Sequence, residues 1–590
     1  MKKQYIVLAI TTALLISACA QEQIVKEHNQ QAKALNKVEQ KDASKPLKET
    51  LTPQPILADE RQMNLSQLSN KSRHQKMKRG QHPSAYQESM IVAPMSIQPP
   101  NATLAIDNEK YRRQIENSIK QVALSPVSTF SIDVDTASYS NVRRLLNQGH
   151  LPQKDAIRVE ELVNYFSYNY PAAPVNNEAA FSVYSEIAPS PYNADKHLLH
   201  LGIQGKKIVD DERPPSNLVF LIDVSGSMNR ANKLGLLKNS LKMLTKQLGE
   251  HDSVAIVVYA GSAGTVLKPT AGNDNQAIVD ALSRLTAGGS TNGGAGINAA
   301  YALAKQSFID GGINRVILAT DGDFNVGTTN QQVLKELIVK QRESGIALSI
   351  LGLGAGNYND ALMQELAQNG NGNAYYIDTL NEARKVLVEE LSSTLMIIAK
   401  DVKIQLEFNP DIVSEYRLIG YETRQLKRQD FNNDKVDAGD IGAGHSVTAL
   451  YEIALVDSAN KAFDPLRYSK KRQSSDVVSD ELAYLRLRYK KPEEAQSQLI
   501  EQPIQVSQVM SSIADASNNF KFSAAVAGFG QFLKNSDNVS TLTNDRIIAL
   551  AQQGRGEDQH GYRSEFINMV KLAQALSPTQ KARETQIVKH

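Results

Sequence analysis

Oxygen-bearing side chains in separate segments of the chain have the types and spacing to hold a hard metal ion. Asp223, Ser225 and Ser227 alternate along the first segment, and Gly226 allows the backbone to turn between them. Carboxylate and hydroxyl oxygens favour a hard divalent cation such as Mg²⁺ or Mn²⁺ over a soft metal. Because a small octahedral ion needs about six oxygens, the remaining ligands must come from elsewhere.

Two further segments could supply those ligands. Thr291 lies in the glycine-rich run Gly288–Gly294 and offers a hydroxyl. Asp321, which is followed by Gly322, offers a second carboxylate. The three segments together predict a metal site built from oxygen ligands alone.

The elements predicted around these segments would bring them to one place. The first segment follows the continuous apolar run Leu218–Ile222, which is typical of a strand covered on both faces. Asp321 directly follows a second predicted strand, Val316–Ala319, and the glycine-rich run precedes a helix predicted over Ala295–Phe308. In doubly wound folds, ligands bind at the carboxyl ends of the strands. We therefore expect all three loops to meet at one rim of a parallel sheet.

Strands and helices alternate throughout this part of the chain, which predicts a doubly wound α/β domain with a mainly parallel sheet. The further strands are predicted at Val254–Tyr259, Thr265–Leu267 (an edge strand), Ile346–Leu353 and Ala374–Ile377. The further helices are predicted at Leu234–Leu248, Asn275–Leu285, Gln331–Gln341, Ala361–Gln368 and Glu382–Ile398.

Alternating apolar residues predict more strands on both sides of the α/β domain. We expect Phe181–Ile203 and Val402–Tyr489 to form one β-sandwich into which the α/β domain is inserted. The strands are predicted at Phe130–Asp135, Phe181–Ile187, His197–Ile203, Val402–Phe408, Tyr416–Tyr421, Val447–Leu455 and Leu482–Tyr489. Flanking helices are predicted at Asn108–Val122, Asn141–Gln148, Val159–Tyr168, Phe520–Leu533, Arg546–Gln552 and Tyr562–Ala575.

The Asp-x-Ser-x-Ser turn, the threonine in a glycine-rich loop and the Thr-Asp-Gly after a strand resemble the metal-ion-dependent adhesion site of von Willebrand factor type A domains. The resemblance covers about residues 216–399. It implies that Mg²⁺, Mn²⁺ or Ca²⁺ is held by Asp223, Ser225, Ser227, Thr291 and Asp321. It also implies that the last coordination position is left for an acidic side chain of a protein partner.

The flanking segments resemble the YfbK-like bacterial lipoproteins, in which a type A domain lies between two flanking regions. The resemblance rests on Phe130–Arg144, Tyr416–Tyr421 and Asp430–Asp440. Together with the predicted elements, it gives five parts: a signal peptide (1–18), a tether (19–108), an α+β flank (109–215), the type A domain (216–399) and a C-terminal flank that is first β and then helical (400–590).

The start of the chain has the plan of a secretory signal, with a charged beginning and a short apolar core. It ends in Ile16-Ser-Ala-Cys19, which resembles the bacterial lipobox. That resemblance implies that Cys19 carries the lipid anchor, and Ala20 implies sorting to an outer membrane, facing the periplasm. A plain signal peptide with an incidental cysteine is the alternative. The polar stretch from Ala20 to Asn108 is predicted to be a disordered tether.

Two other acidic segments have weaker patterns. Asp430, Asn432 and Asp434 are spaced as in a calcium loop, but Lys435 and Ile441 stand where an EF-hand needs Gly and Glu. A turn rich in Asp and Asn is the first interpretation, and a weak Ca²⁺ site is the alternative. Asp133 and Asp135 faintly repeat the Asp-x-Ser-x-Ser turn, and we interpret them as strand and helix caps.

Composition narrows the function classes. The 590 residues contain 65 basic and 63 acidic side chains, and a net charge of +2 argues against a nucleic-acid binder. A single cysteine excludes an intramolecular disulfide and a thiolate zinc site. The pattern predicts a non-enzymatic, lipid-anchored protein that binds a partner through the metal. An adaptor in envelope assembly is the second hypothesis, and a metal-dependent hydrolase that uses Asp323 as base is the third.

Overall fold

The computed structural model describes most of the chain after residue 108, and these residues belong to one compact unit, Gln98–His590. The predicted signal peptide and tether, which include Cys19 and Ala20, lie outside the described residues, and so do Thr291 and Asp323. No helix within the described part of the chain is long and apolar enough to cross a membrane. The described residues are 109–172, 179–207, 213–290, 293–322, 331–355, 358–464, 480–492, 494 and 496–577.

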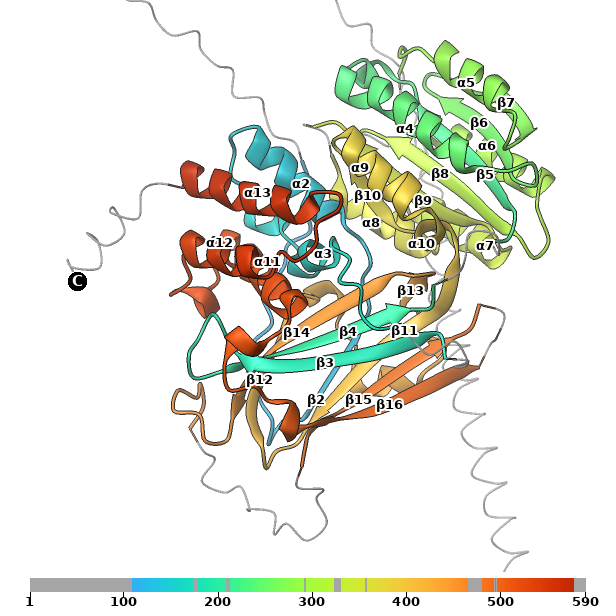
Figure 1. The fold of residues 1–590 in the computed structure, drawn as a ribbon. Coiled ribbons are helices and arrows are strands. Elements are labelled where there is room, and N and C mark those ends of the chain that lie inside the picture. The colour runs from blue at the N-terminus through green and yellow to red at the C-terminus, as the bar shows by residue number, and fades with distance from the viewer. Residues whose placement is uncertain are drawn as a thin grey trace, which may run out of the picture. The chain divides into compact units, whose positions relative to one another are not determined.

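A six-stranded sheet forms the centre of the α/β domain (Figure 1). Its neighbouring strands are parallel except at one edge, where β7 runs antiparallel to β6. This confirms the predicted doubly wound domain and its edge strand. In sheet order the strands are β10 (Ala374–Ile377), β9 (Ala347–Leu353), β8 (Ile313–Thr320), β5 (Ser216–Asp223), β6 (Ser253–Tyr259) and β7 (Ala263–Ala271).

Helices cover both faces of this sheet, which explains the continuous apolar run of β5. Leu218 and Phe220 pack in a core that includes α4, α5 and α9, whereas Val219 and Leu221 pack in a second core that includes α6, α7 and α8. Alternate residues of one strand thus serve opposite layers. The helices are α4 (Leu236–Leu244), α5 (Asn275–Arg284), α6 (Gly293–Gln306), α7 (Gln331–Glu343), α8 (Asp360–Asn369), α9 (Leu380–Arg384) and α10 (Leu391–Leu395).

Two antiparallel sheets built from both flanks share one hydrophobic core, which confirms the predicted β-sandwich with an inserted domain. In the first sheet β4 pairs with β14, although the whole α/β domain separates them in sequence. That sheet has the order β1 (Lys120–Gln121), β12 (Val413–Ile419), β14 (Ser446–Leu455), β4 (His197–Gly205), β3 (Phe181–Pro189). The second is β13 (Gly439–Gly442), β11 (Ile397–Phe408), β15 (Glu481–Lys490), β16 (Ser497–Gln505), with β2 (Val127–Ser131) also paired to β11.

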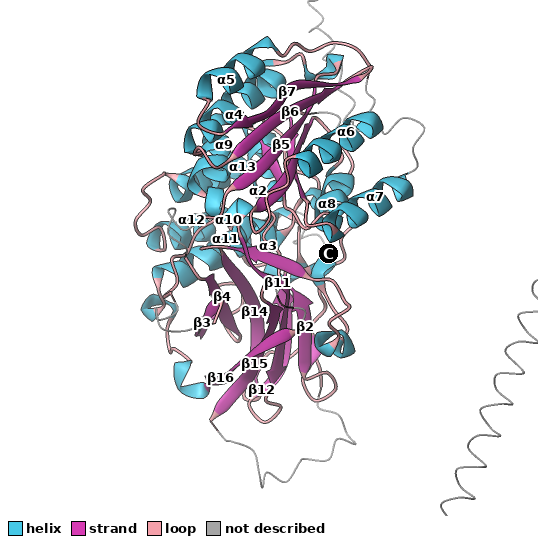
Figure 2. Ribbon diagram, turned by 90° about the vertical axis from the view of Figure 1, so that its right-hand side faces the viewer, coloured by secondary structure: helices cyan, strands magenta, loops and turns pink. Residues whose placement is uncertain are grey.

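Five flanking helices pack together over the outer face of the first sheet. Leu198 and Leu450 of that sheet belong to their core, whereas the neighbouring Leu199 and Tyr451 face the interior of the sandwich. Figure 2 shows these helices between the sandwich and the α/β domain. They are α2 (Ala137–Asn147), α3 (Val159–Asn164), α11 (Asn518–Leu533), α12 (Asn544–Gln553) and α13 (Tyr562–Leu576).

Three expectations about the elements need correction. The helix predicted over Asn108–Val122 is wrong, because its described residues form an extended segment that ends in β1. Its polar side chains bond to distant parts of the fold; for example, the Asn117 amide donates to the carbonyl oxygen of Gly420 (2.7 Å). The helix predicted over Glu382–Ile398 is interrupted by a wide turn at Lys385–Glu389 and ends before β11. Strands β1, β13 and β16 were not predicted.

Candidate metal centre

The Asp-x-Ser-x-Ser segment forms a tight turn at the carboxyl end of β5. The Asp223 side chain is fully buried, and its Oδ1 accepts a hydrogen bond from the backbone N–H of Ser225 (2.8 Å). The hydroxyl oxygens of Ser225 and Ser227 lie 2.9 Å apart. A carboxylate and two hydroxyls are therefore gathered at one strand end.

The glycine-rich loop lies directly against this turn. The backbone N–H of Gly226 donates to the carbonyl oxygen of Gly289 (3.1 Å), and the N–H of Gly288 donates to that of Val224 (2.7 Å). Gly289 has φ +88°, a left-handed conformation that favours glycine. These bonds hold the start of the loop that carries Thr291 beside the turn, although Thr291 itself lies outside the described residues.

Asp321 arrives at the same rim from the neighbouring strand. β8 is parallel to β5, with Ala319 opposite Ile222, so Asp321 follows one strand where Asp223 ends the next. Both carboxylates are fully buried. Burial raises the pKa of Asp223, the hydrogen bonds from Ser225 oppose this, and the negative charge of Asp321 raises it further. The two acids are thus near enough to repel each other.

Hydroxyl groups complete the surroundings of Asp223. Its Oδ2 accepts a hydrogen bond from the Tyr259 hydroxyl (3.3 Å) and a long one from that of Thr320 (3.5 Å). Burial, and next the charge of Asp223, hold the pKa of Tyr259 well above its usual range, so this hydroxyl keeps its proton and remains a donor. The partners of Asp223 among the described residues are thus neutral donors.

Sequence reasoning missed Tyr259 at this rim, and it also missed a charged group, Lys233. Its ammonium donates to Oδ2 of Asp321 (2.7 Å), and its side chain is 3% exposed. Lys233 follows the Asp-x-Ser-x-Ser turn closely, in a non-helical conformation (φ −123°, ψ −105°) just before α4. A basic residue in a loop before a helix carries no local signal of burial, so only the fold reveals this contact.

The donors at this rim fit a hard divalent cation. Two buried carboxylates and two hydroxyls offer oxygen ligands, and one ammonium offsets only half of the carboxylate charge. Burial, and to a smaller extent the charge of Asp321, raise the pKa of Asp223, and a bound cation would oppose both by stabilising the ionised carboxylate. Asp223, Ser225, Ser227 and Asp321 would hold it. A cation in such a site supplies an electrophilic position that accepts one more anionic oxygen.

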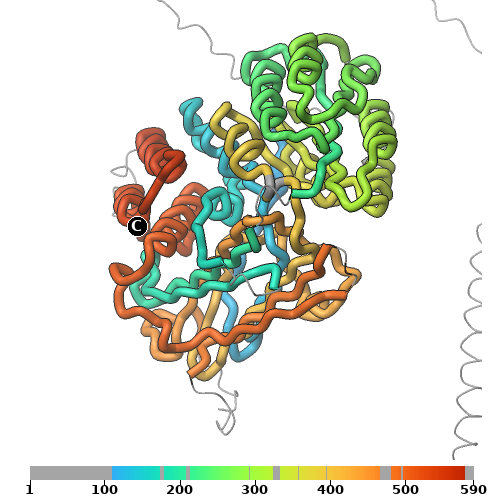
Figure 3. Tube along the Cα trace, turned by 45° about the vertical axis from the view of Figure 1, so that its right-hand side comes forward, coloured from blue at the N-terminus to red at the C-terminus, as the bar shows by residue number. Residues whose placement is uncertain are grey.

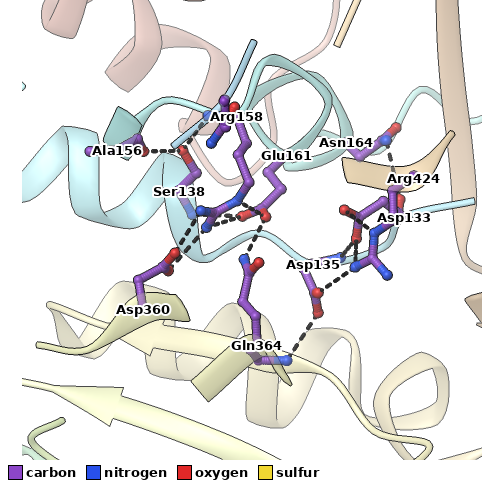
Figure 4. A network of polar contacts seen from close by, with 12 residues as sticks. Asp133, Asp135, Ser138, Ala156, Arg158, Glu161, Asn164, Asp360, Gln364 and Arg424 are labelled. Atoms are coloured by element: carbon purple, nitrogen blue, oxygen red, sulfur yellow. Dashed lines mark hydrogen bonds and ion pairs between the residues drawn. The ribbon is translucent and has the colours of Figure 1, made fainter. Parts of the chain in front are cut away.

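A second acidic cluster lies where the flanks meet the α/β domain (Figure 4). Asp133, Asp135 and Glu161 each place a carboxylate oxygen within 4.8 Å of the others, and all three are buried. Arg424 donates to both Asp133 and Asp135, at 2.9–3.0 Å. The interpretation of these aspartates as caps is therefore wrong, because no side chain caps α2 and the arginine binds them instead.

The same cluster joins the two halves of the fold. Arg158, just before α3, donates to Glu161 of that helix. It also donates to both carboxylate oxygens of Asp360 at the start of α8, at 2.6 and 3.0 Å. Asp135 accepts a hydrogen bond from the backbone N–H of Ala374 in β10 (3.0 Å). In the chain trace the flanks, blue to teal and orange to red, lie together beside the green and yellow α/β domain (Figure 3).

The proposed calcium loop does not converge on one point. Asp434 bonds to Arg488 (3.1 Å) and to the Ser497 hydroxyl. Asp437 instead pairs with Arg342 of α7 (2.8 Å). These acids therefore face separate partners. No three acids of this loop lie close enough together, within the described residues, to share a metal ion.

Comparison with known proteins matches both the domain and its flanks. The model "von Willebrand factor type A domain" matches residues 217–390, "Uncharacterized protein YfbK, C-terminal" matches 393–576, and "von Willebrand factor" matches 105–200. "Uncharacterized protein YfbK" of Escherichia coli (strain K12) is 48% identical over 475 residues, covering 79% of this chain and 81% of that protein.

Other similarities are more distant. "Uncharacterized protein sll0103" of Synechocystis is 27% identical over 239 residues, which cover 39% of this chain and 55% of that protein. A solved structure, "von Willebrand factor type A from Catenulispora acidiphila", is 16% identical, with a TM-score of 0.37, and the match covers 69% of this chain and 91% of that one. The extent and identity of the E. coli match settle the relationship: the chain belongs to the YfbK family and carries a von Willebrand factor type A domain.

Proposed function

We propose that this protein binds a protein partner in the cell envelope through a divalent cation at the rim of its type A domain, with an acidic side chain of the partner completing the coordination. The observation that carries the proposal is the meeting of the Asp223 turn and Asp321 at adjacent strand ends, both buried and mutually repelling. Type A domains generally mediate protein binding and often hold a divalent cation.

The residues of the rim have distinct parts in this proposal. Asp223 and Asp321 supply the negative charge that balances a divalent cation, while Ser225 and Ser227 supply neutral oxygens, so four ligands leave coordination positions open on an ion that takes about six. Tyr259 and the backbone N–H of Ser225 fix the orientation of the Asp223 carboxylate. A partner carboxylate can then fill an open position, because carboxylate oxygens are preferred ligands of hard divalent cations.

We also propose that Cys19 anchors the protein by lipid in an outer membrane, with the folded part facing the periplasm. The support is the lipobox-like Ile16–Cys19 after a short apolar core. Several acyl chains together give a stable anchor, whereas one chain binds only marginally. Labelling of growing cells with a fatty acid analogue, compared with a Cys19→Ala variant, tests this part independently of the metal.

The role we propose is binding and not catalysis. The side chains at the rim are cation ligands and hydroxyl donors. Such groups can hold a metal ion, and we therefore propose a binding role. Hydrolysis of phosphodiester or phosphomonoester substrates by the purified full-length protein with Mg²⁺, lost in Asp223→Ala, would contradict this.

The test of the main proposal compares full-length wild-type protein with Asp223→Ala and with Asp280→Ala. Asp280 is an exposed acid on α5 of the same domain and gives a matched loss of one charge. Mg²⁺ binding is measured by calorimetry, and partner capture from detergent-solubilised envelopes is measured with Mg²⁺ or EDTA. We expect Asp223→Ala and EDTA to abolish both, and Asp280→Ala to retain both. Capture of the same partners by Asp223→Ala would overturn the proposal.

A further inference from the structure

The buried ammonium at the metal centre is built into the fold. Lys233 is 3% exposed, whereas lysine is almost never buried without a partner. Its backbone is held in a non-helical conformation inside the wide turn Ala231–Gly235. This conformation directs the side chain toward the rim of the sheet, where it meets Asp321.

A glycine makes room for the stem of this lysine. A Cβ added at Gly354, at the end of β9, would lie 2.2 Å from Cε of Lys233 and 2.8 Å from its Cγ. Gly354 also has φ +79°, a conformation that favours glycine. The lysine side chain therefore packs along bare backbone, and its position is fixed at the stem as well as at the ammonium.

The lysine neutralises one of the two acids selectively. Its ammonium lies 2.7 Å from Oδ2 of Asp321. Asp223, by contrast, receives hydrogen bonds from a backbone N–H and from hydroxyl groups. The ammonium of Lys233 thus already neutralises part of the negative charge that would attract a divalent metal ion.

We propose that Lys233 is a resident counter-cation that competes with the divalent cation for Asp321, and so sets the affinity of the metal centre. This inference rests on the proposed function, because it concerns the same site. Two cations cannot share one carboxylate in a buried site without strong repulsion. Binding of the metal ion therefore moves the ammonium away from Asp321. In the metal-free protein the lysine instead stabilises the buried acid.

The first test uses Mn²⁺, whose free concentration is followed by electron paramagnetic resonance, with the full-length protein. Lys233→Gln keeps a hydrogen-bond donor but removes the charge, and Lys233→Met removes both. Lys238→Gln, on α4, is the matched control, since its ammonium donates to the carbonyl oxygens of Ser283 and Leu285 and not to an acid. We expect both Lys233 variants to bind Mn²⁺ at least about tenfold more tightly than wild type, and the control to change less than about twofold.

The second test needs no substitution at the site. Acetylation of lysines by an activated ester is followed by mass spectrometry in EDTA and in saturating Mn²⁺, with exposed Lys246 as the internal reference. We expect the reactivity of Lys233 to rise severalfold with Mn²⁺, because its ammonium is released from Asp321. Unchanged reactivity of Lys233 in Mn²⁺-loaded protein would overturn the proposal.

The outcomes separate this inference from the proposed function. Equal or weaker Mn²⁺ binding by the Lys233 variants, in a wild type that binds the ion, defeats the competition alone. Failure of wild type and of all variants to bind Mn²⁺ defeats the metal centre itself. Binding by the Lys233 variants but not by wild type supports competition and overturns metal-bridged partner binding by the natural protein.

Discussion

Two of the buried groups of carboxylates in the described part of the chain have different kinds of partner. At the junction of the flanks and the type A domain, Asp133, Asp135 and Glu161 meet the guanidinium groups of Arg424 and Arg158. At the rim of the type A domain, Asp223 meets hydroxyls and a backbone N–H, and the ammonium of Lys233 meets Asp321.

The difference separates a group of acids that joins two parts of the fold from a group that could hold a cation. Guanidinium forks bind carboxylates with two parallel hydrogen bonds and keep their charge in every condition. A metal ion would have to displace them at the junction, even though three acids converge there. The hydroxyls at the rim carry no charge, so they leave the negative charge of Asp223 uncompensated. The nature of the partners, more than the number of acids, therefore identifies the candidate metal centre.

The largest effect that we expect comes from removing a guanidinium at the junction. Arg424→Gln leaves Asp133 and Asp135 buried without their counter-charge and should lower the free energy of unfolding by about 3–5 kcal/mol. Chemical denaturation measures this. The control is Arg486→Gln, whose partner Glu501 is about one-third exposed, and which should cost less than about 1 kcal/mol. Equal losses of unfolding free energy in the two variants would contradict a structural role for the acids at the junction.

A smaller effect, dependent on the cation, is expected at the rim. Asp223→Asn removes a like charge from beside Asp321, so its stability in EDTA should equal or exceed that of wild type. Mg²⁺ should stabilise wild type by about 2.7 kcal/mol at a hundred times its dissociation constant, and should not stabilise the variant. Thermal unfolding with EDTA and with Mg²⁺ measures both. A stability loss in EDTA as large as that of Arg424→Gln would make the rim a structural cluster too.

Counted per pH unit, the smallest effect is a pH dependence of stability at the junction. Burial, and next the charge of Asp133, raise the pKa of Asp135. The folded protein therefore keeps a proton that the unfolded chain releases near pH 4, and the stability that this group contributes is lost as the pH rises toward the folded pKa. The free energy of unfolding of Asp135→Asn should therefore increase relative to that of wild type as the pH rises, by at most about 1.4 kcal/mol per pH unit. Parallel curves of unfolding free energy against pH would show that Asp135 is ionised throughout.

The sequence predicted that Asp223 and Asp321 lie at one rim of the sheet, because the signals for this placement are local. Asp223 ends an apolar strand, and Asp321 follows another, so type, spacing and position all point to one place. The roles of Asp133 and Asp135 were missed because their partner Arg424 lies almost three hundred residues away. No local pattern distinguishes an aspartate that meets a distant arginine from one that caps a helix.

Long-range polar contacts also explain the main error in the fold. Residues 109–119 carry side chains that suit a polar helix, yet Gln114 bonds to Asp155 and Asn117 bonds to Leu418 and Gly420. Those contacts require an extended backbone and outweigh a weak helix preference. Most buried strands, whose apolar pattern is set by the faces that they cover, were predicted close to their observed bounds, but β2 (Val127–Ser131) overlaps the predicted Phe130–Asp135 at only two residues.

The insertion of the type A domain has a consequence for the order in which the chain acquires its structure. The domain can complete its sheet from contiguous sequence, whereas β4 must wait for β14, which emerges from the ribosome much later. Gly205 at the end of β4 lies beside Ile398 at the start of β11, so the folded domain holds its own two ends together. An early-folding type A domain thereby shortens the loop that the sandwich must close, and lowers the entropy cost of joining its halves.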